Sequence, residues 1–165
     1  MKTLALSLFL ATIGGAAIAE TPAVIAVWSE NSGSLPPEYA WEYRVEMLTG
    51  GTVQATYCKG YATEGPGCAT VKRKFSAAAQ KAMEDAIEPL AQDLLDNPPQ
   101  QAGDDEIPIG GGSTSGRLML GETPIILYAF PRAADVSRVQ EVLKILQAST
   151  PPGLVEKAKK RAKQP

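Results

Sequence analysis

Residues 41–75 read WEYRVEMLTGGTVQATYCKGYATEGPGCATVKRKF, and the order of apolar and polar side chains in this stretch decides the fold. Three segments with alternating side chains are separated by two connections that contain glycine. Alternation with a period of two is typical of strands that cover a core with one face and meet water with the other. The stretch therefore predicts a meander of three antiparallel strands.

The two cysteines set the register of the second hairpin in this meander. If Cys58 lies opposite Cys68, then Thr56 faces Thr70 in a polar row. On the other face the same register pairs Tyr57 with Ala69, Ala55 with Val71 and Val53 with Arg73. Apart from Arg73, that face is apolar and is the one we expect to cover the core.

The first hairpin agrees with this register only if its loop has three residues, 49–51. That loop pairs Met47 with Val53, Val45 with Ala55 and Tyr43 with Tyr57. A two-residue loop at Gly50-Gly51 would mix the two faces, because a slip of one residue exchanges them. The three-residue loop also places Gly51 at a position that needs a left-handed backbone.

The segments on either side of the meander predict a further strand and a helix. Residues 23–28 are a short apolar run, which is typical of a strand buried on both faces. Ser76 is placed to cap a helix that Asn97-Pro98-Pro99 ends. Because proline removes a helical hydrogen bond, we expect a kink or a break near Ile87-Glu88, just before Pro89.

The last third of the chain predicts a hairpin and two helices. Residues 117–120 and 123–130 form the hairpin, and the second strand is apolar on both faces, so we place it in the centre of the sheet. A helix follows with Val139, Val142, Leu143 and Leu146 at helical spacing and a capping box at Ser137 and Gln140. Thr150-Pro151 begins the final helix. The whole order indicates an α+β fold: an antiparallel sheet, built from a three-stranded meander and a hairpin, with two or three helices packed on one face.

The first 19 residues have the three parts of a cleavable signal peptide. Lys2 precedes an uncharged run at residues 4–13, and Ala17 and Ala19 occupy the positions that signal peptidase requires. We therefore expect an exported protein, periplasmic or secreted after cleavage near Ala19, with no transmembrane segment. Residues 20–155 are expected to form one domain, and residues 156–165 a basic C-terminal tail.

Composition restricts the chemistry of the mature chain. The sequence has no histidine, which excludes Ser-His-Asp and Cys-His catalysis and imidazole-bound metals. Its two cysteines stand ten positions apart in a chain bound for an oxidising compartment, so we expect a Cys58–Cys68 disulfide. We expect no catalytic site, metal or cofactor, and the acidic body of the chain offers no electrostatic footprint for nucleic acid.

The loop that the disulfide closes is the candidate binding element. Tyr61, Thr63, Glu64 and Pro66 lie in it, and we predict that they bind another exported protein, as an inhibitor or accessory subunit does. The other explanation is a hairpin end that the disulfide only stabilises. The segment from residue 28 to residue 41 is a second candidate surface, although core packing also explains its two tryptophans.

Two alternatives of another class remain open. A small hydrolase or ligand-binding protein would use carboxylates, or a serine with a lysine base, on the 104–115 connection: Asp104, Asp105, Glu106, Ser113 and Ser115. A solvated acidic turn and a flexible approach to a strand explain the same residues. The basic tail would allow weak contact with an anionic surface, as in a structural component of the cell envelope.

Overall fold

The structure is a computed structural model that describes residues 23–104, 107–108 and 110–163. The predicted signal peptide, residues 1–19, lies outside the described residues. Within the described ranges, no helix combines the length and the apolar character needed to cross a membrane.

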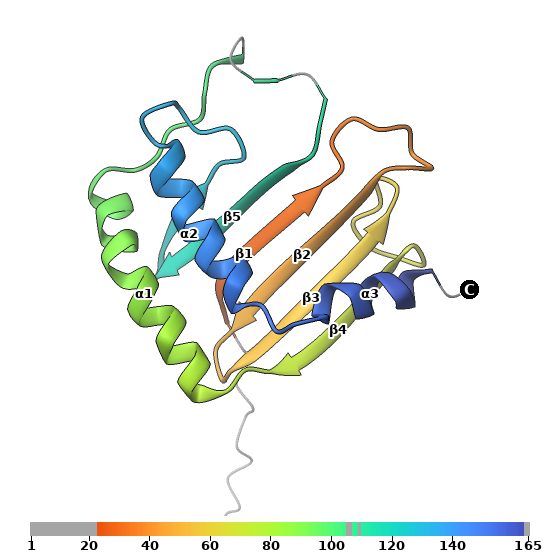
Figure 1. Cartoon of the computed structure of the whole chain (residues 1–165), viewed down its shortest axis with the longest axis horizontal. Helices are drawn as coiled ribbons and strands as arrows, with labels where there is room; N and C mark the ends of the chain where they lie inside the picture. The colour runs from red at the N-terminus through yellow and green to blue at the C-terminus, as the bar shows by residue number, and fades with distance from the viewer. Residues whose placement is uncertain (1–22, 105–106, 109, 164–165) are drawn as a thin grey trace, which may run out of the picture.

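Six strands form one antiparallel sheet, and three helices pack on one of its faces (Figure 1). The strands are β1 (Val24–Asn31), β2 (Trp41–Leu48), β3 (Thr52–Lys59), β4 (Cys68–Lys74), β5 (Ser113–Leu120) and β6 (Thr123–Leu127), in the spatial order β4-β3-β2-β1-β5-β6. The helices are α1 (Ala77–Asp96), α2 (Val136–Ser149) and α3 (Leu154–Ala162). The predicted α+β fold is confirmed.

The meander has the predicted register. Cys58 lies opposite Cys68, and Met47 lies opposite Val53. The β2–β3 connection is the three-residue loop, and Gly51 in it has a left-handed φ of 69°. Alternation of side chains was sufficient here because only this register makes the inner face of all three strands apolar, with Arg73 and the terminal Lys59 as the polar residues on it.

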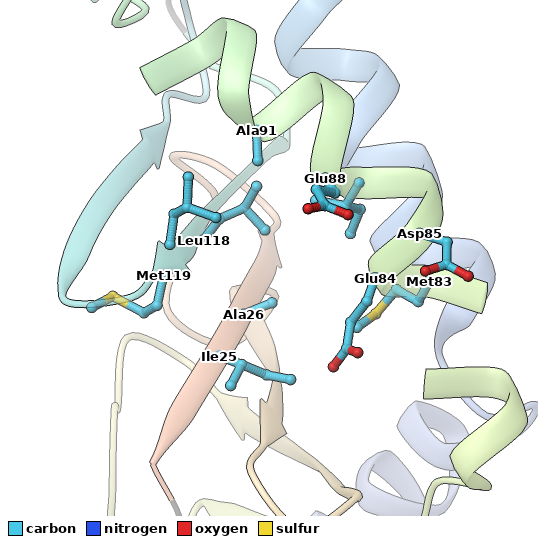
Figure 2. A pocket seen from close by; sticks show the side chains of 11 residues that line it. Ile25, Ala26, Met83, Glu84, Asp85, Glu88, Ala91, Leu118 and Met119 are labelled. Carbon is cyan, nitrogen blue, oxygen red and sulfur yellow. The ribbon is translucent and has the colours of Figure 1, made fainter. Parts of the chain in front are cut away.

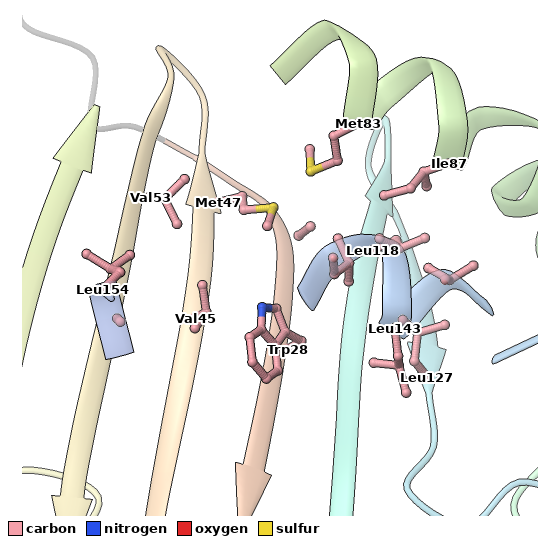
Figure 3. Close-up of a cluster of buried hydrophobic side chains, with 14 of the residues drawn as sticks. Trp28, Val45, Met47, Val53, Met83, Ile87, Leu118, Leu127, Leu143 and Leu154 are labelled. Atoms are coloured by element: carbon pink, nitrogen blue, oxygen red, sulfur yellow. The ribbon is translucent and has the colours of Figure 1, made fainter. Parts of the chain in front are cut away.

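The core lies between the sheet and the helices (Figure 3). Trp28, Val45 and Met47 line up across the central strands and are almost completely buried. The indole nitrogen of Trp28 donates a hydrogen bond to the hydroxyl of Thr150 at 3.0 Å, so its one polar atom is satisfied. Helices α1 and α2 cover the β1–β5–β6 half of the sheet, and α3 covers β3 and β4.

The opposite face of the sheet is polar. Neighbouring strands pair hydroxyl with hydroxyl there, Thr56 with Thr70 at 2.8 Å and Ser29 with Ser115 at 3.2 Å. Arg44 makes an ion pair of 2.6 Å with Glu46 on the same strand. This face needs no helix above it because its side chains are hydrated or paired with one another.

The prediction that the strand after Gly121-Glu122 is central was wrong. β6 ends at Leu127 and forms an edge of the sheet. Ile125 and Leu127 face the helices, but Ile126 is 41% exposed on the polar face, so the apolar pattern on both sides has two different causes. Pro124 lacks a backbone N–H and is tolerated at such an edge.

Helix α1 begins as predicted and does not break at Pro89. The hydroxyl of Ser76 accepts the N–H of Ala79 at 3.1 Å, and Asn97 ends the helix. Pro89 lies on the exposed side of the helix, where a backbone carbonyl that lacks its helical donor is accessible to solvent. The helix packs on the core both before and after Pro89 through its buried side chains: Met83, Ile87, Ala91 and Leu94.

The ends of the other two helices differ from the sequence-based prediction. Asp135 is the N-cap of α2, so Ser137 lies inside the helix and forms no capping box. Thr150 ends α2 and does not begin α3, which starts at Leu154. Leu154, Ala158 and Ala162 are buried against the sheet, so residues 156–162 belong to the packed domain and not to a separate tail.

A polar cluster joins the end of α1 to the start of α2. The Asp135 carboxylate accepts the backbone N–H of Gln100 at 3.0 Å and a hydrogen bond from Arg138. The same guanidinium binds Asp93 at 2.7 Å and the carbonyl of Asn97. The Gln100 N–H and then the Arg138 side chain hold the pKa of Asp135 below its usual value.

Replacing Asp135 is expected to make stability depend less on pH. A lowered pKa in the folded state means that the carboxylate stabilises the fold above the usual value of about 4 and loses this effect as the pH falls through the folded value. Asp135→Asn should therefore unfold at lower urea concentration than the native chain at pH 7, with a difference that shrinks below about pH 4. Urea titrations at several pH values measure this, with the exposed Asp104→Asn as the matched control. A difference that stays constant down to pH 2 would contradict the assignment.

Gly116 in β5 is expected to tolerate no side chain. A Cβ there would lie 2.6 Å from the Val27 carbonyl oxygen and 3.1 Å from a methyl group of Leu143 on α2. Gly116→Ala should lower the free energy of unfolding by about 1–3 kcal/mol, because β5 and α2 must move apart. Thermal unfolding measures the loss. The exposed Thr123→Ala serves as control, with an expected change below about 0.5 kcal/mol.

Candidate functional site

Two long loops meet at one end of the sheet (Figure 1). Residues 32–40 connect β1 to β2, and residues 60–67 connect β3 to β4. Because adjacent strands are antiparallel, alternate connections of this meander emerge at the same end. We call these two loops together the loop end.

The Cys58–Cys68 disulfide closes the base of the second loop. The two Cα atoms are 4.0 Å apart at the last paired position of β3 and β4. Above the bridge, the N–H of Lys59 donates to the carbonyl of Gly67 at 3.0 Å, and the N–H of Cys68 donates to Gly65 at 3.0 Å. The disulfide and these two hydrogen bonds therefore hold the two ends of the loop together where it leaves the sheet.

Hydrogen bonds join the two loops to each other. The N–H of Gly60 donates to the carbonyl of Ala40 at 2.8 Å. The hydroxyl of Tyr61 donates to the carbonyl of Leu35. One loop thus supports the other, and the disulfide stabilises both.

The base of the first loop rests on aromatic side chains. The N–H of Trp41 donates to the hydroxyl of Ser32 at 3.0 Å, and the indole stacks on Tyr43 with ring centroids 5.6 Å apart. The Tyr43 hydroxyl donates to Glu30, and burial followed by this carboxylate raises the pKa of Tyr43 well above its usual value. Core packing explains Trp28, which is 5% exposed, while Trp41 is half-buried beneath the loop.

Exposed apolar side chains gather at the loop end. Four large apolar side chains in the described part of the chain are exposed, and three of them lie here: Leu35 at 41%, Tyr39 at 67% and Tyr61 at 63%. The fourth, Ile126, is on the β6 edge. Tyrosine rings that are fixed in place and exposed are the usual anchors of protein interfaces.

The predicted binding residues lie in the second loop, and all four are exposed: Tyr61, Thr63, Glu64 and Pro66. Thr63 and Ala62 line a shallow hollow of about 190 Å³ above the polar face, together with Glu42 and Arg44. Leu35 and Tyr39 fall within the 28–41 segment, but no local sequence pattern distinguishes them from their neighbours. The signal that would have found them is the β1–β2 pairing, which brings their loop beside the disulfide-bounded one.

The alternative site on the 104–115 connection has its serines in cross-strand pairs. The Asn31 amide donates to the hydroxyl of Ser113 at 3.0 Å, and Ser115 pairs with Ser29. Asp104 is exposed, whereas Asp105 and Glu106 lie outside the described residues. The glycine-rich stretch before β5 packs closely on the first loop, because a Cβ on Gly33 would lie 1.6 Å from the carbonyl oxygen of Gly111.

No protein-family model matches this chain, and no curated protein matches its sequence.

Removing the disulfide is expected to destabilise the whole domain. A bridge closing a loop of this length stabilises a fold by about 3 kcal/mol on the chain-entropy estimate. The double variant Cys58→Ala/Cys68→Ala should lose about that much free energy of unfolding in urea, and reduction of the native protein should lose a similar amount. Reductant should leave the double variant unchanged, which is the control. Equal stability of the oxidised and reduced native protein would contradict the expectation.

Proposed function

We propose that this chain is an exported, non-catalytic protein that binds another protein through the loop end. The observation that carries the proposal is the clustering of Leu35, Tyr39 and Tyr61 on two adjoining loops that are fixed at their bases. Exposing three large apolar groups on two adjoining loops is unfavourable in water, and exposed apolar groups gathered in one region are typical of a surface that a partner covers.

The rigidity of the loop end favours binding. A flexible loop loses conformational entropy when a partner immobilises it, at about 0.5–1.5 kcal/mol for each long side chain that becomes ordered. Here the disulfide, the Gly60–Ala40 hydrogen bond and the Tyr61–Leu35 hydrogen bond restrict the loops before any partner arrives. Burial of the two tyrosine rings then contributes more fully to affinity.

The chemistry around the loop end favours a protein partner over a charged ligand. Glu64 is the acidic side chain of the predicted set, and Glu38 lies in the first loop, so each loop carries one carboxylate within three residues of an exposed tyrosine. We propose a partner that offers an apolar cleft with a basic margin, of the kind an inhibitor or accessory subunit occupies. The signal peptide that the sequence predicts and the disulfide favour an extracytoplasmic location for this encounter.

The test separates the loop end from the fourth exposed apolar group. Tagged protein starting at residue 20 is used to capture partners from a periplasmic extract, beside the variants Tyr39→Ser/Tyr61→Ser and Ile126→Ser. We expect a stoichiometric partner that the double variant loses at least tenfold and that Ile126→Ser retains. Both variants should keep the unfolding midpoint of the native protein within a few degrees, because all three side chains are exposed.

Two results would overturn the proposal. A partner retained by the double variant would place the interface elsewhere on the molecule. A partner lost equally with Ile126→Ser would show that capture follows general apolar exposure and not the loop end.

The variant Tyr61→Phe tests the contribution of the hydroxyl alone. It keeps the ring and removes the hydroxyl that binds Leu35, so a modest loss of partner binding is expected.

A further inference from the structure

A second hollow lies at the opposite end of the sheet from the loop end, between α1 and the strands β1 and β5 (Figure 2). Its volume is about 390 Å³. Pockets that bind small molecules begin at about 300 Å³, so this one suits a small ligand. It shares no residue with the loop end, so a ligand could bind here whether or not the loop end binds a partner.

The floor of this pocket is apolar, and small side chains create its depth. The apolar lining residues come from three elements: Ile25, Ala26, Met83, Ile87, Ala91, Leu118, Met119 and Leu120. Ala26 and Ala91 are almost completely buried and end at Cβ, which leaves space between the strand and the helix. The register shift between Val24 and Ala26 lies at the same place, and such an irregularity bends a strand and widens the space beside it.

The rim of the pocket is acidic. Glu84, Asp85 and Glu88 lie along α1 above the apolar floor, and the lining contains no basic residue. Asp85 points away from the pocket and makes an ion pair of 2.8 Å with Lys81. Glu84 extends from the helix toward the space beside Ile25 and accepts a hydrogen bond of 2.8 Å from the Gln80 amide, and Glu88 lines the rim one helical turn further along.

We infer that this pocket binds a small apolar molecule that carries one positive charge, such as an alkylammonium. The apolar part would lie against Leu118 and Met119, where burial removes it from water. The ammonium group would lie at the rim, where the carboxylates of Glu84 and Glu88 accept its hydrogen bonds. A neutral ligand of the same shape lacks the second interaction, and an anion is repelled.

The methionines of the chain provide the measurement. From residue 20 onward these are Met47, Met83 and Met119. Met83 and Met119 line the pocket, whereas Met47 is 1% exposed and does not line it. Protein labelled with ¹³C at the methionine methyl groups is titrated with n-octylammonium, n-octanol and octanoate. We expect octylammonium to shift the Met83 and Met119 signals, with little change at Met47, and to bind at least about fivefold more tightly than octanol.

Three variants test the assignment of each part. Glu84→Gln/Glu88→Gln should bind octanol as before and lose the preference for octylammonium, while Glu141→Gln on the exposed side of α2 should keep it. Ala91→Leu fills the pocket and should abolish binding of both probes. Because leucine is a strong helix former, this variant should retain a cooperative thermal transition.

Three results would overturn the inference. Equal affinity for octylammonium and octanol in the native protein would show a pocket that ignores charge. A preference that survives in the doubly substituted protein would place the cation elsewhere. Absence of shifts at Met83 and Met119 with every probe, at concentrations up to about 1 mM, would show that the pocket binds no ligand of this class.

Discussion

The pairing of β3 with β4 is the constraint on which the rest of the structure depends. At one end of the pair the Cys58–Cys68 disulfide holds the two strands together. At the other end the N–H of Phe75 donates to the carbonyl of Gly51 at 2.8 Å, where β4 gives way to the first helix. With both ends held, a slip of one residue is blocked, and Val53, Ala55 and Tyr57 must face the helices. The same pairing holds the two ends of the second loop together, and it thereby places Tyr61 beside Leu35.

Much of the fold could be predicted because it depends on residues that are close to one another in the sequence. In residues 41–75 the register of one hairpin must agree with that of the other, because both share β3. Ser76 and Asn97 mark the two ends of α1, because each can cap a helix. The position of β6 could not be predicted this way, because its apolar residues are equally compatible with a central strand and with an edge whose Ile126 is left exposed. The start of α2 could not be predicted either, because the helix begins at Val136 after Asp135, whose carboxylate binds Gln100 and Arg138, and Ser137 lies inside the first turn. These failures share a cause: each depends on which element becomes a neighbour in space.

The candidate site was predictable only in part, for the same reason. The disulfide-bounded loop was visible as a constrained segment with an exposed tyrosine, because cysteine spacing and glycine content are local properties. The contribution of Leu35 and Tyr39 arises from the β1–β2 hairpin, and the acidic pocket arises from three elements that lie far apart in the sequence. The two ends of the sheet consequently differ in character. One presents aromatic side chains on a rigid support, and the other encloses an apolar hollow beneath carboxylates.

The packing of α3 on β3 and β4 has a consequence for how the protein folds. This helix follows all six strands in the sequence, yet its buried residues Leu154, Ala158 and Ala162 cover β3 and β4, which come much earlier. The apolar face of this half of the sheet is therefore covered only when α3 packs on it, and contacts of such long sequence separation form slowly. This order of elements is compatible with the export proposed above, because the sheet cannot complete its core before α3 is available.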